Sequence, residues 1–265
     1  MAGSDLPLGK PTGYIDTYTP SLLHSIPRSE ARQRIGLPEP VMFTGEDVWW
    51  CYELTWLDDG GKPYVAALQL NVPCTSASIV ESKSLKLYLN SFAQTRFNSN
   101  LDVLNTLNSD LSVAFQAPVI VQLLELNQLP TPVEQLPGFC LDSLDVQIDD
   151  YEVNPTLLEL EEGEDRRAKE TLHTTLFRSL CPVTGQPDFA SVFISYLGRP
   201  IERSGLLSYL VSYRCHQAFH EATMEQVYYD LMQRCRPEQL SVSGHFLRRG
   251  GIDINPFRSN VESGA

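Results

Sequence analysis

The chain has 265 residues, of which 42% are apolar and 20% are charged, close to the averages of globular proteins. It can therefore bury a core, either as one large domain or as two fused smaller ones. Its 20 basic and 33 acidic side chains leave a formal charge of −13, which would repel a phosphate backbone and argues against a general nucleic-acid-binding protein.

No targeting or membrane segment is recognisable. Met1 is followed by Ala-Gly-Ser-Asp rather than by the basic and apolar stretches of a signal peptide, and no apolar run approaches the length of a membrane span. We therefore expect a cytoplasmic protein without a membrane partner. The six cysteines are spread along the chain with no C-x-x-C pair, which favours free thiols over disulfides. The nearest group of metal-ligand type, Cys215-His216 with His220, lacks the usual spacing, so no metal site is predicted.

The first half of the chain predicts strands and helices after a long arm. Residues 1–46 are rich in Pro, Gly and Ser and show no hydrophobic period, so they should form an extended arm. The Asp58–Lys62 segment favours a hairpin turn between two β-rich runs. Apolar side chains then recur at helical spacing before β-type sequence returns. The predicted elements are strands at Val48–Leu57 and Tyr64–Val72, helices at Glu81–Phe92 and Leu101–Phe115, and strands at Val119–Leu126 and Leu144–Ile148.

The second half repeats this order. Its predicted elements are strands at Leu172–Leu180 and Phe189–Tyr196, helices at Arg203–Tyr213 and Phe219–Cys235, and a strand at Leu240–Leu247 that runs into Ile252–Ile254. An offset of 121 residues superposes a helical stripe of the first half on the second: Glu81 on Glu202, Leu85 on Leu206, Tyr88 on Tyr209, Leu89 on Leu210, Ser91 on Ser212 and Phe92 on Tyr213. We therefore predict two copies of one ββααββ unit, at 47–158 and 166–265, separated by the acidic stretch Glu159–Asp165.

The two copies differ in their reactive side chains. At the same offset, Cys181, Asp188, His220 and Glu221 correspond to Gly60, Ala67, Ser99 and Asn100. The first copy instead carries the polar triplet Glu81-Ser82-Lys83, where the second has Glu202-Arg203-Ser204. Duplicated copies that diverge in this way suggest one composite site rather than two equal ones.

Four ordered blocks of sequence resemble the motifs of a known enzyme family. They are Glu81–Tyr88 (ESKSLKLY), Cys181–Phe189 (CPVTGQPDF), Phe219-His220-Glu221 and Arg248–Pro256 (RRGGIDINP). These blocks resemble the NADPH-dependent 7-cyano-7-deazaguanine reductases, the QueF family of queuosine biosynthesis, in its longer two-module branch. The resemblance covers nearly the whole chain. It implies an α+β fold of tandem tunnelling-fold (T-fold) units, with helices outside antiparallel sheets, and a homodimer.

The resemblance also implies roles for individual residues. Cys181 would attack the nitrile carbon to give a covalent thioimide, Asp188 would protonate its nitrogen, and His220 would assist the proton transfer. The substrate would be held by Val80, Glu81, Ser82, His220 and Glu221, and NADPH by Ser82, Lys83, Arg249 and Gly250. Two NADPH per turnover and no metal would complete the reduction to the aminomethyl compound. No Gly-x-Gly-x-x-Gly follows a strand, so a Rossmann site for the cofactor is not expected.

Simpler roles are open for some of these residues. Glu81 and Glu221 could serve helix N-termini, Asp188 after Pro187 could be a turn residue, and Arg248–Gly251 could be a bulged strand end. Two other functions also stay open. One is a zinc-dependent cyclohydrolase of the same fold, like GTP cyclohydrolase I, with Cys and His as ligands. The other is a purine- or pterin-binding module without turnover.

Overall fold

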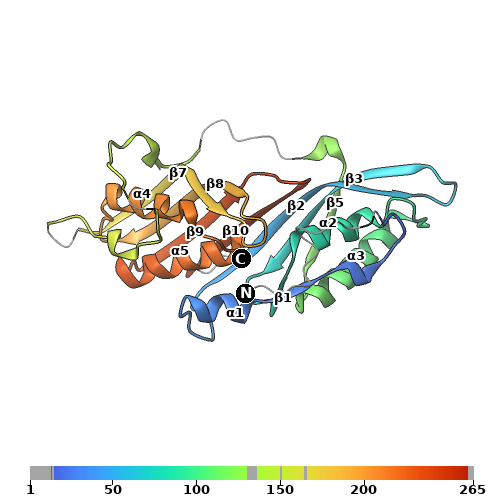
Figure 1. The fold of residues 1–265 in the computed structure, drawn as a ribbon, viewed down its shortest axis with the longest axis horizontal. Helices are drawn as coiled ribbons and strands as arrows, with labels where there is room; N and C mark the ends of the chain where they lie inside the picture. Colours follow the sequence, from blue (N-terminus) through green and yellow to red (C-terminus); the bar gives the residue numbers. More distant parts are fainter. Residues whose placement is uncertain (1–12, 14, 130–135, 150, 164–165, 262–265) are drawn as a thin grey trace. The chain divides into compact units, whose positions relative to one another are not determined.

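The computed structural model describes residues 13, 15–129, 136–149, 151–163 and 166–261, which divide into two compact units (Figure 1). The first unit draws on Met1–Ala31, Glu46–Pro132 and Arg248–Ile254. The second draws on Arg32–Gly45, Val133–Leu247 and Asn255–Ala265. These units are each assembled from several segments and are not the repeats expected from the sequence. The predicted division into an arm at 1–46 and repeats at 47–158 and 166–265 stays a prediction. Residues 1–12 and 14 of the arm and 164–165 of the acidic stretch lie outside the described residues.

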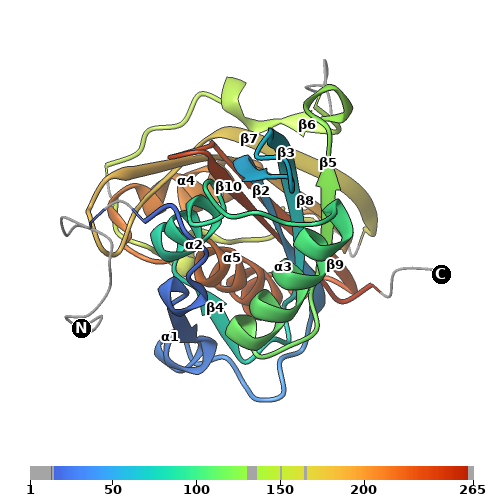
Figure 2. The ribbon, with the colours of Figure 1, turned by 90° about the vertical axis from the view of Figure 1, so that its right-hand side faces the viewer.

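The first unit has an antiparallel sheet with the strand order β5-β3-β2. Strand β2 (Thr44–Leu57) forms a hairpin with β3 (Pro63–Pro73), and β5 (Ile120–Leu124) pairs with the other side of β3. Helices α2 (Ser82–Asn90) and α3 (Asn100–Phe115) lie on the same side of these strands (Figures 1 and 2). Alternation along β2 turns Trp49 and Cys51 into the core beneath the helices, and a register shift between Cys51 and Leu54 brings Trp56 to the same side.

The second unit has the complete ββααββ order. It consists of β7 (Ala168–Leu180), β8 (Pro187–Gly198), α4 (Arg203–Ser212), α5 (His220–Arg234), β9 (Gln239–Phe246) and β10 (Ile252–Ser259). Its strand order is β10-β9-β8-β7-β6, in which the short β6 (Phe139–Cys140) is parallel to β7 and the other pairs are antiparallel. The predicted α+β class with antiparallel sheets is therefore confirmed. Short 3-10 helices lie at Pro20–Leu22, Leu126–Gln128, Leu141–Ser143, Pro155–Leu157 and Tyr213–Cys215.

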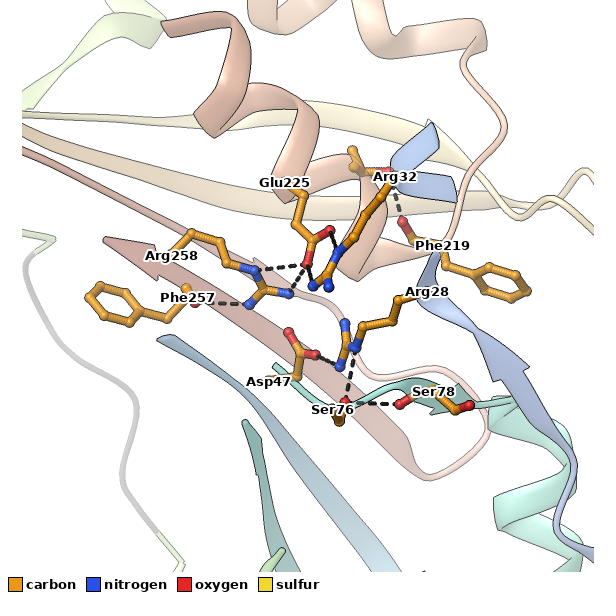
Figure 3. A network of polar contacts seen from close by, with 10 residues as sticks. Arg28, Arg32, Asp47, Ser76, Ser78, Phe219, Glu225, Phe257 and Arg258 are labelled. Atoms are coloured by element: carbon orange, nitrogen blue, oxygen red, sulfur yellow. Dashed lines mark hydrogen bonds and ion pairs between the residues drawn. The ribbon is translucent and has the colours of Figure 1, made fainter. Parts of the chain in front are cut away.

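The prediction of an extended arm is wrong for residues 25–34. Strand β1 (Ser25–Pro27) pairs with β4 (Ser78–Val80), and helix α1 (Arg28–Arg34) follows. The α1 sequence, RSEARQR, has a single apolar residue and so no hydrophobic period to recognise. It is held by its charges instead. The Arg28 guanidinium donates to the Asp47 carboxylate (2.5 Å) and to the Ser76 hydroxyl (2.9 Å), and both Arg28 and Asp47 are buried (Figure 3).

Two further predictions are wrong. Residues 144–148 form no strand: their side chains alternate in burial, but the backbone has no neighbouring strand to pair with. Strand β9 also does not run into Ile252–Ile254. Gly250 (φ 64°) and Gly251 (φ 85°) form a two-residue turn closed by hydrogen bonds between Arg249 and Ile252, and the chain returns as β10.

Two details of packing recur in both units. Glu81 is the N-cap of α2, and Glu202, 121 residues later, is the N-cap of α4. The Tyr88 hydroxyl donates to Asp110 (2.7 Å) in the first unit, and the Tyr209 hydroxyl donates to Asp230 (2.7 Å) in the second. Burial, the largest cause, raises the pKa of both tyrosines. The sequence offset therefore corresponds to equivalent local structure.

Candidate active site

Cys181 lies in the loop that joins β7 to β8. The strands end with Leu180 opposite Pro187, and the Cys181 N–H donates to the Gln186 carbonyl (2.8 Å). The Gly185 N–H returns to the Cys181 carbonyl (2.9 Å), with Gly185 at a φ of 68° that glycine adopts without strain. Cys181 is a thiol and only 3% exposed. This tight loop therefore holds a buried thiol at the end of the sheet.

Asp188 and His220 meet beside this loop. Asp188 is the second residue of β8 and lies opposite Ser179, two residues before Cys181. Its Oδ2 is 3.3 Å from Nε2 of His220, the first residue of α5, and the two side chains are only 6% and 14% exposed. The loop before α5 is fixed to the same end of β7, because the Leu180 N–H donates to the His216 carbonyl (2.8 Å). The three predicted catalytic residues thus come from one hairpin and one helix start in the second unit.

The imidazole of His220 is also held on its face. It is stacked on the ring of Phe246, with centroids 3.8 Å apart and planes 6° from parallel. Its Nδ1 is buried and has no hydrogen-bond partner among the described residues. The ring therefore has one edge on a carboxylate and one face on an aromatic ring, and it buries a second nitrogen that has no partner among the described residues.

Glu221 follows His220 in the first turn of α5 and is 3% exposed. An exposed acid would suffice to complement the helix dipole, whereas burying a carboxylate is costly unless it is hydrogen-bonded. The helix start is fixed by the Thr223 hydroxyl, which donates to the Phe219 carbonyl (2.9 Å). Glu221 therefore lies in the same unit as the Asp188–His220 pair, one residue after His220 along the chain.

Glu81 has a structural role in the first unit. Its Oε1 accepts from the Lys83 N–H (2.8 Å) and its Oε2 from the Ser84 N–H (2.9 Å), so it caps α2 while fully buried. Val80, also buried, ends β4 just before it, and Ser82 and Lys83 are half-buried in the first turn of α2. A carboxylate has about four lone-pair sites, so capping leaves Glu81 able to accept further hydrogen bonds. Its predicted contact with the substrate stays a prediction.

Arg249 and Gly250 lie in the β9–β10 turn, also in the first unit, and both are exposed. A Cβ added to Gly250 would lie 3.4 Å from the Lys86 ammonium of α2, and one added to Gly251 would overlap the Glu53 carboxylate at 2.6–2.8 Å. The turn therefore packs closely on Glu53 and Lys86, which form an ion pair at 3.5 Å. A small cavity of about 30 Å³ lies at this contact, lined by Cys51, Glu53, Lys86, Leu89, Asn90, Gly250, Gly251 and Ile252.

The Lys86 ammonium of α2 thus lies beside the glycine turn, which Arg248 and Arg249 precede in the sequence. Arg248 adds its guanidinium over the ring of Tyr52, 4.9 Å from the centroid. Guanidinium and ammonium groups bind phosphate oxygens well, so these residues fit the phosphates of a dinucleotide. Glycines in the turn let a ligand approach the backbone.

The described residues contain no group of three His, Cys, Asp or Glu side chains placed to hold a metal ion. Within the same part of the chain, no helix has the length and apolar character needed to cross a membrane.

The sequence did not predict Phe246 as a residue of the site. Alternation along β9 places its side chain on the buried side of the strand, but no spacing in the sequence indicates that it meets the side chain of His220.

Known proteins match nearly the whole chain. A family model described as "Nitrile reductase, 7-cyano-7-deazaguanine-reductase N-term" matches residues 14–123, and one described as "QueF-like protein" matches residues 187–265. The NADPH-dependent 7-cyano-7-deazaguanine reductase of Bordetella avium is 47% identical over 266 residues, covering 100% of this chain and 97% of the relative. That of Burkholderia pseudomallei is 48% identical over 257 residues, covering 96% and 93%.

A solved structure of the archaeosine synthase QueF-Like in the apo form has 17% sequence identity and a TM-score of 0.30, and it covers 37% of this chain and 95% of that one. This likeness is too low to carry an argument. The fold and the two family matches define a two-module α+β protein of the QueF type. The chain belongs to the family of 7-cyano-7-deazaguanine reductases.

Proposed function

We propose that this chain reduces the nitrile of 7-cyano-7-deazaguanine to the aminomethyl group with NADPH, a step toward the queuosine modification of tRNA. Relatives of that name align over essentially their full length. The observation that carries the proposal is the Asp188–His220 pair beside the Cys181 loop, which puts a thiol and a proton donor pair at one end of one sheet.

The thiol of Cys181 provides the nucleophile. A nitrile carbon is a weak electrophile, and a soft thiolate is suited to attack it. The S–C bond forms as one π bond of the nitrile opens, and the proton that left sulfur is balanced by one that reaches nitrogen. The product is a covalent thioimide, and no atom is lost.

Asp188 and His220 transfer the protons that the reaction requires. A carboxyl group and an imidazole in contact, both largely screened from water, can pass a proton to the nitrogen of the nitrile and later to that of the amine. Nδ1 of His220, which has no partner among the described residues, is the donor position left for the substrate. Because a released imine would hydrolyse to an aldehyde, the buried setting of Cys181 also protects the intermediate.

NADPH supplies a hydride in each of two steps, the first to the thioimide and the second to the imine left when sulfur departs. Lys83 and Arg249 provide the positive charge that its phosphates require, with Ser82 and Gly250 beside them. Val80, Glu81, Ser82, His220 and Glu221 hold the deazaguanine, whose ring N–H groups suit the two carboxylates. We infer that the active form is a homodimer in the cytoplasm.

A turnover assay tests the proposal. Purified enzyme with 7-cyano-7-deazaguanine should oxidise two NADPH for each aminomethyl product, measured by absorbance and by mass spectrometry of the product. Cys181→Ser should reduce the rate to background, because a serine hydroxyl is too weakly acidic for comparable activation. Full turnover by Cys181→Ser, or consumption of NADPH without amine, would refute the proposed reaction.

A further inference from the structure

Phe246 is packed against His220 more tightly than aromatic rings usually are. Aromatic pairs commonly have centroids about 4.5–7 Å apart, whereas these rings are 3.8 Å apart and 6° from parallel. The Nε2 atom of the same ring lies 3.3 Å from Oδ2 of Asp188. With one edge and one face fixed, the imidazole cannot turn about its side-chain bonds without losing one contact or the other.

Phe246 is itself rigidly held. It is the last residue of β9, 4% exposed, and lies opposite Ala190 of β8. The ring of Phe177 meets it edge-on, at 6.2 Å and 89°. On the same side of β9, a Cβ at Gly244 would come within 3.0 Å of the Phe246 ring and 2.7 Å of the Met224 sulfur. Gly244 therefore leaves the room that the Phe246 ring occupies.

We propose that Phe246 is a positioning residue for the reaction: its ring fixes the plane of His220, so that Nε2 stays on Asp188 while Nδ1 faces the substrate. The inference rests on the proposed function. Phe246 thus acts through His220 and touches no reacting atom.

The test compares Phe246→Leu with Phe115→Leu. Both remove a buried ring, but Phe115 packs on Trp49 in the first unit and has no ring contact with His220 or Phe246 among the described residues. In Phe246→Leu, we expect the rate of thioimide formation without NADPH to fall about 10- to 100-fold, while the Kd for NADPH stays within about twofold. In Phe115→Leu, both values should stay near those of the wild type.

Equal effects of the two substitutions on the rate of adduct formation would overturn the proposal, since Phe246 would then be an ordinary core residue. If Phe246→Leu does not fold, an NMR measurement on the wild type tests the stacked geometry instead. The ring current of Phe246 should move the His220 ring protons upfield of their chemical shifts in the unfolded chain. Unshifted His220 ring protons would also overturn the proposal. A wild-type enzyme that forms no adduct would instead contradict the proposed function.

Discussion

At the residue scale, two glutamates in equivalent places have different expected roles. Glu81 and Glu202 each accept hydrogen bonds from two backbone N–H groups at a helix start. The sequence offset predicted their equivalence, and the simpler explanation considered for Glu81, a helix cap, describes its contacts. Spacing alone could not decide between cap and ligand, because both roles need an acid at the same position.

Substitution of Glu202, the N-cap of α4, tests how much such a cap stabilises the fold. Burial acts to raise its pKa, but hydrogen bonds from Gly205 and Ser204 outweigh this and hold the pKa below its usual 4.5. Its stabilisation is therefore fully present above pH 4.5 and lost as the pH falls through the lowered pKa. Glu202→Gln should reduce the free energy of unfolding by about 0.5–2 kcal/mol at pH 7, measured by urea denaturation. The difference from the wild type should shrink below pH 4.5.

Glu162→Gln serves as the control, because Glu162 is an exposed acid of the same charge. Its stability should match that of the wild type within about 0.5 kcal/mol. A loss in Glu202→Gln that is the same at pH 3 as at pH 7 would show that the cap is not the cause.

At the element scale, periodicity predicted the helices that cover the sheets within about two residues, because each has an apolar stripe and a definite start. It failed for α1, which is attached by charge. Arg32 donates to Glu225 of α5 at 2.8 and 2.9 Å, and Arg258 of β10 donates to the same carboxylate at 2.9 and 3.2 Å (Figure 3). All three are buried, and both guanidiniums lie over the ring of Phe43. Residues 193 and 33 positions apart give no local signal of such a contact.

This network predicts a large cost for Glu225→Gln. Without the carboxylate, two buried guanidiniums lose their counter-charge, and breaking a buried ion pair costs about 3–5 kcal/mol. For a chain of this size we expect the melting temperature to fall by roughly 6–20 °C, measured by calorimetry.

The matched control is Glu161→Gln, which breaks the exposed Arg166–Glu161 pair (3.4 Å). Exposed pairs contribute about 0–1 kcal/mol, so its melting temperature should change little. Comparable melting temperatures for the two variants would mean that the buried network does not stabilise the fold as described.

At the scale of the whole molecule, the repeat predicted more than the order of elements. It placed Glu81 on Glu202 and Tyr88 on Tyr209. In the structure both glutamates are N-caps, and each tyrosine donates to an aspartate, of α3 or of α5. The repeat did not predict the pairing of β6 with β7, nor the absence of a strand at residues 144–148. Both depend on which segments lie side by side in the fold rather than on the local sequence pattern. The candidate site residues were predicted by motif, whereas the contact of Asp188 with His220 came from the fold.

The rival cyclohydrolase differs in its dependence on metal. Activity of the purified enzyme should survive EDTA, and zinc measured by atomic emission should be far below one equivalent per chain. GTP should not be hydrolysed under the same conditions. Stoichiometric zinc together with loss of activity on chelation would favour the rival.

We expect Cys181 to form a covalent adduct with the nitrile before any hydride arrives. Intact mass spectrometry of the enzyme mixed with 7-cyano-7-deazaguanine, without NADPH, should show a species heavier by one whole substrate molecule, because addition across the nitrile expels nothing. Peptide mapping should place it on Cys181, and Cys181→Ala should not form it. Lys83→Ala should form it while losing affinity for NADPH. An adduct on another cysteine, or none at all in an enzyme that turns over, would contradict the account.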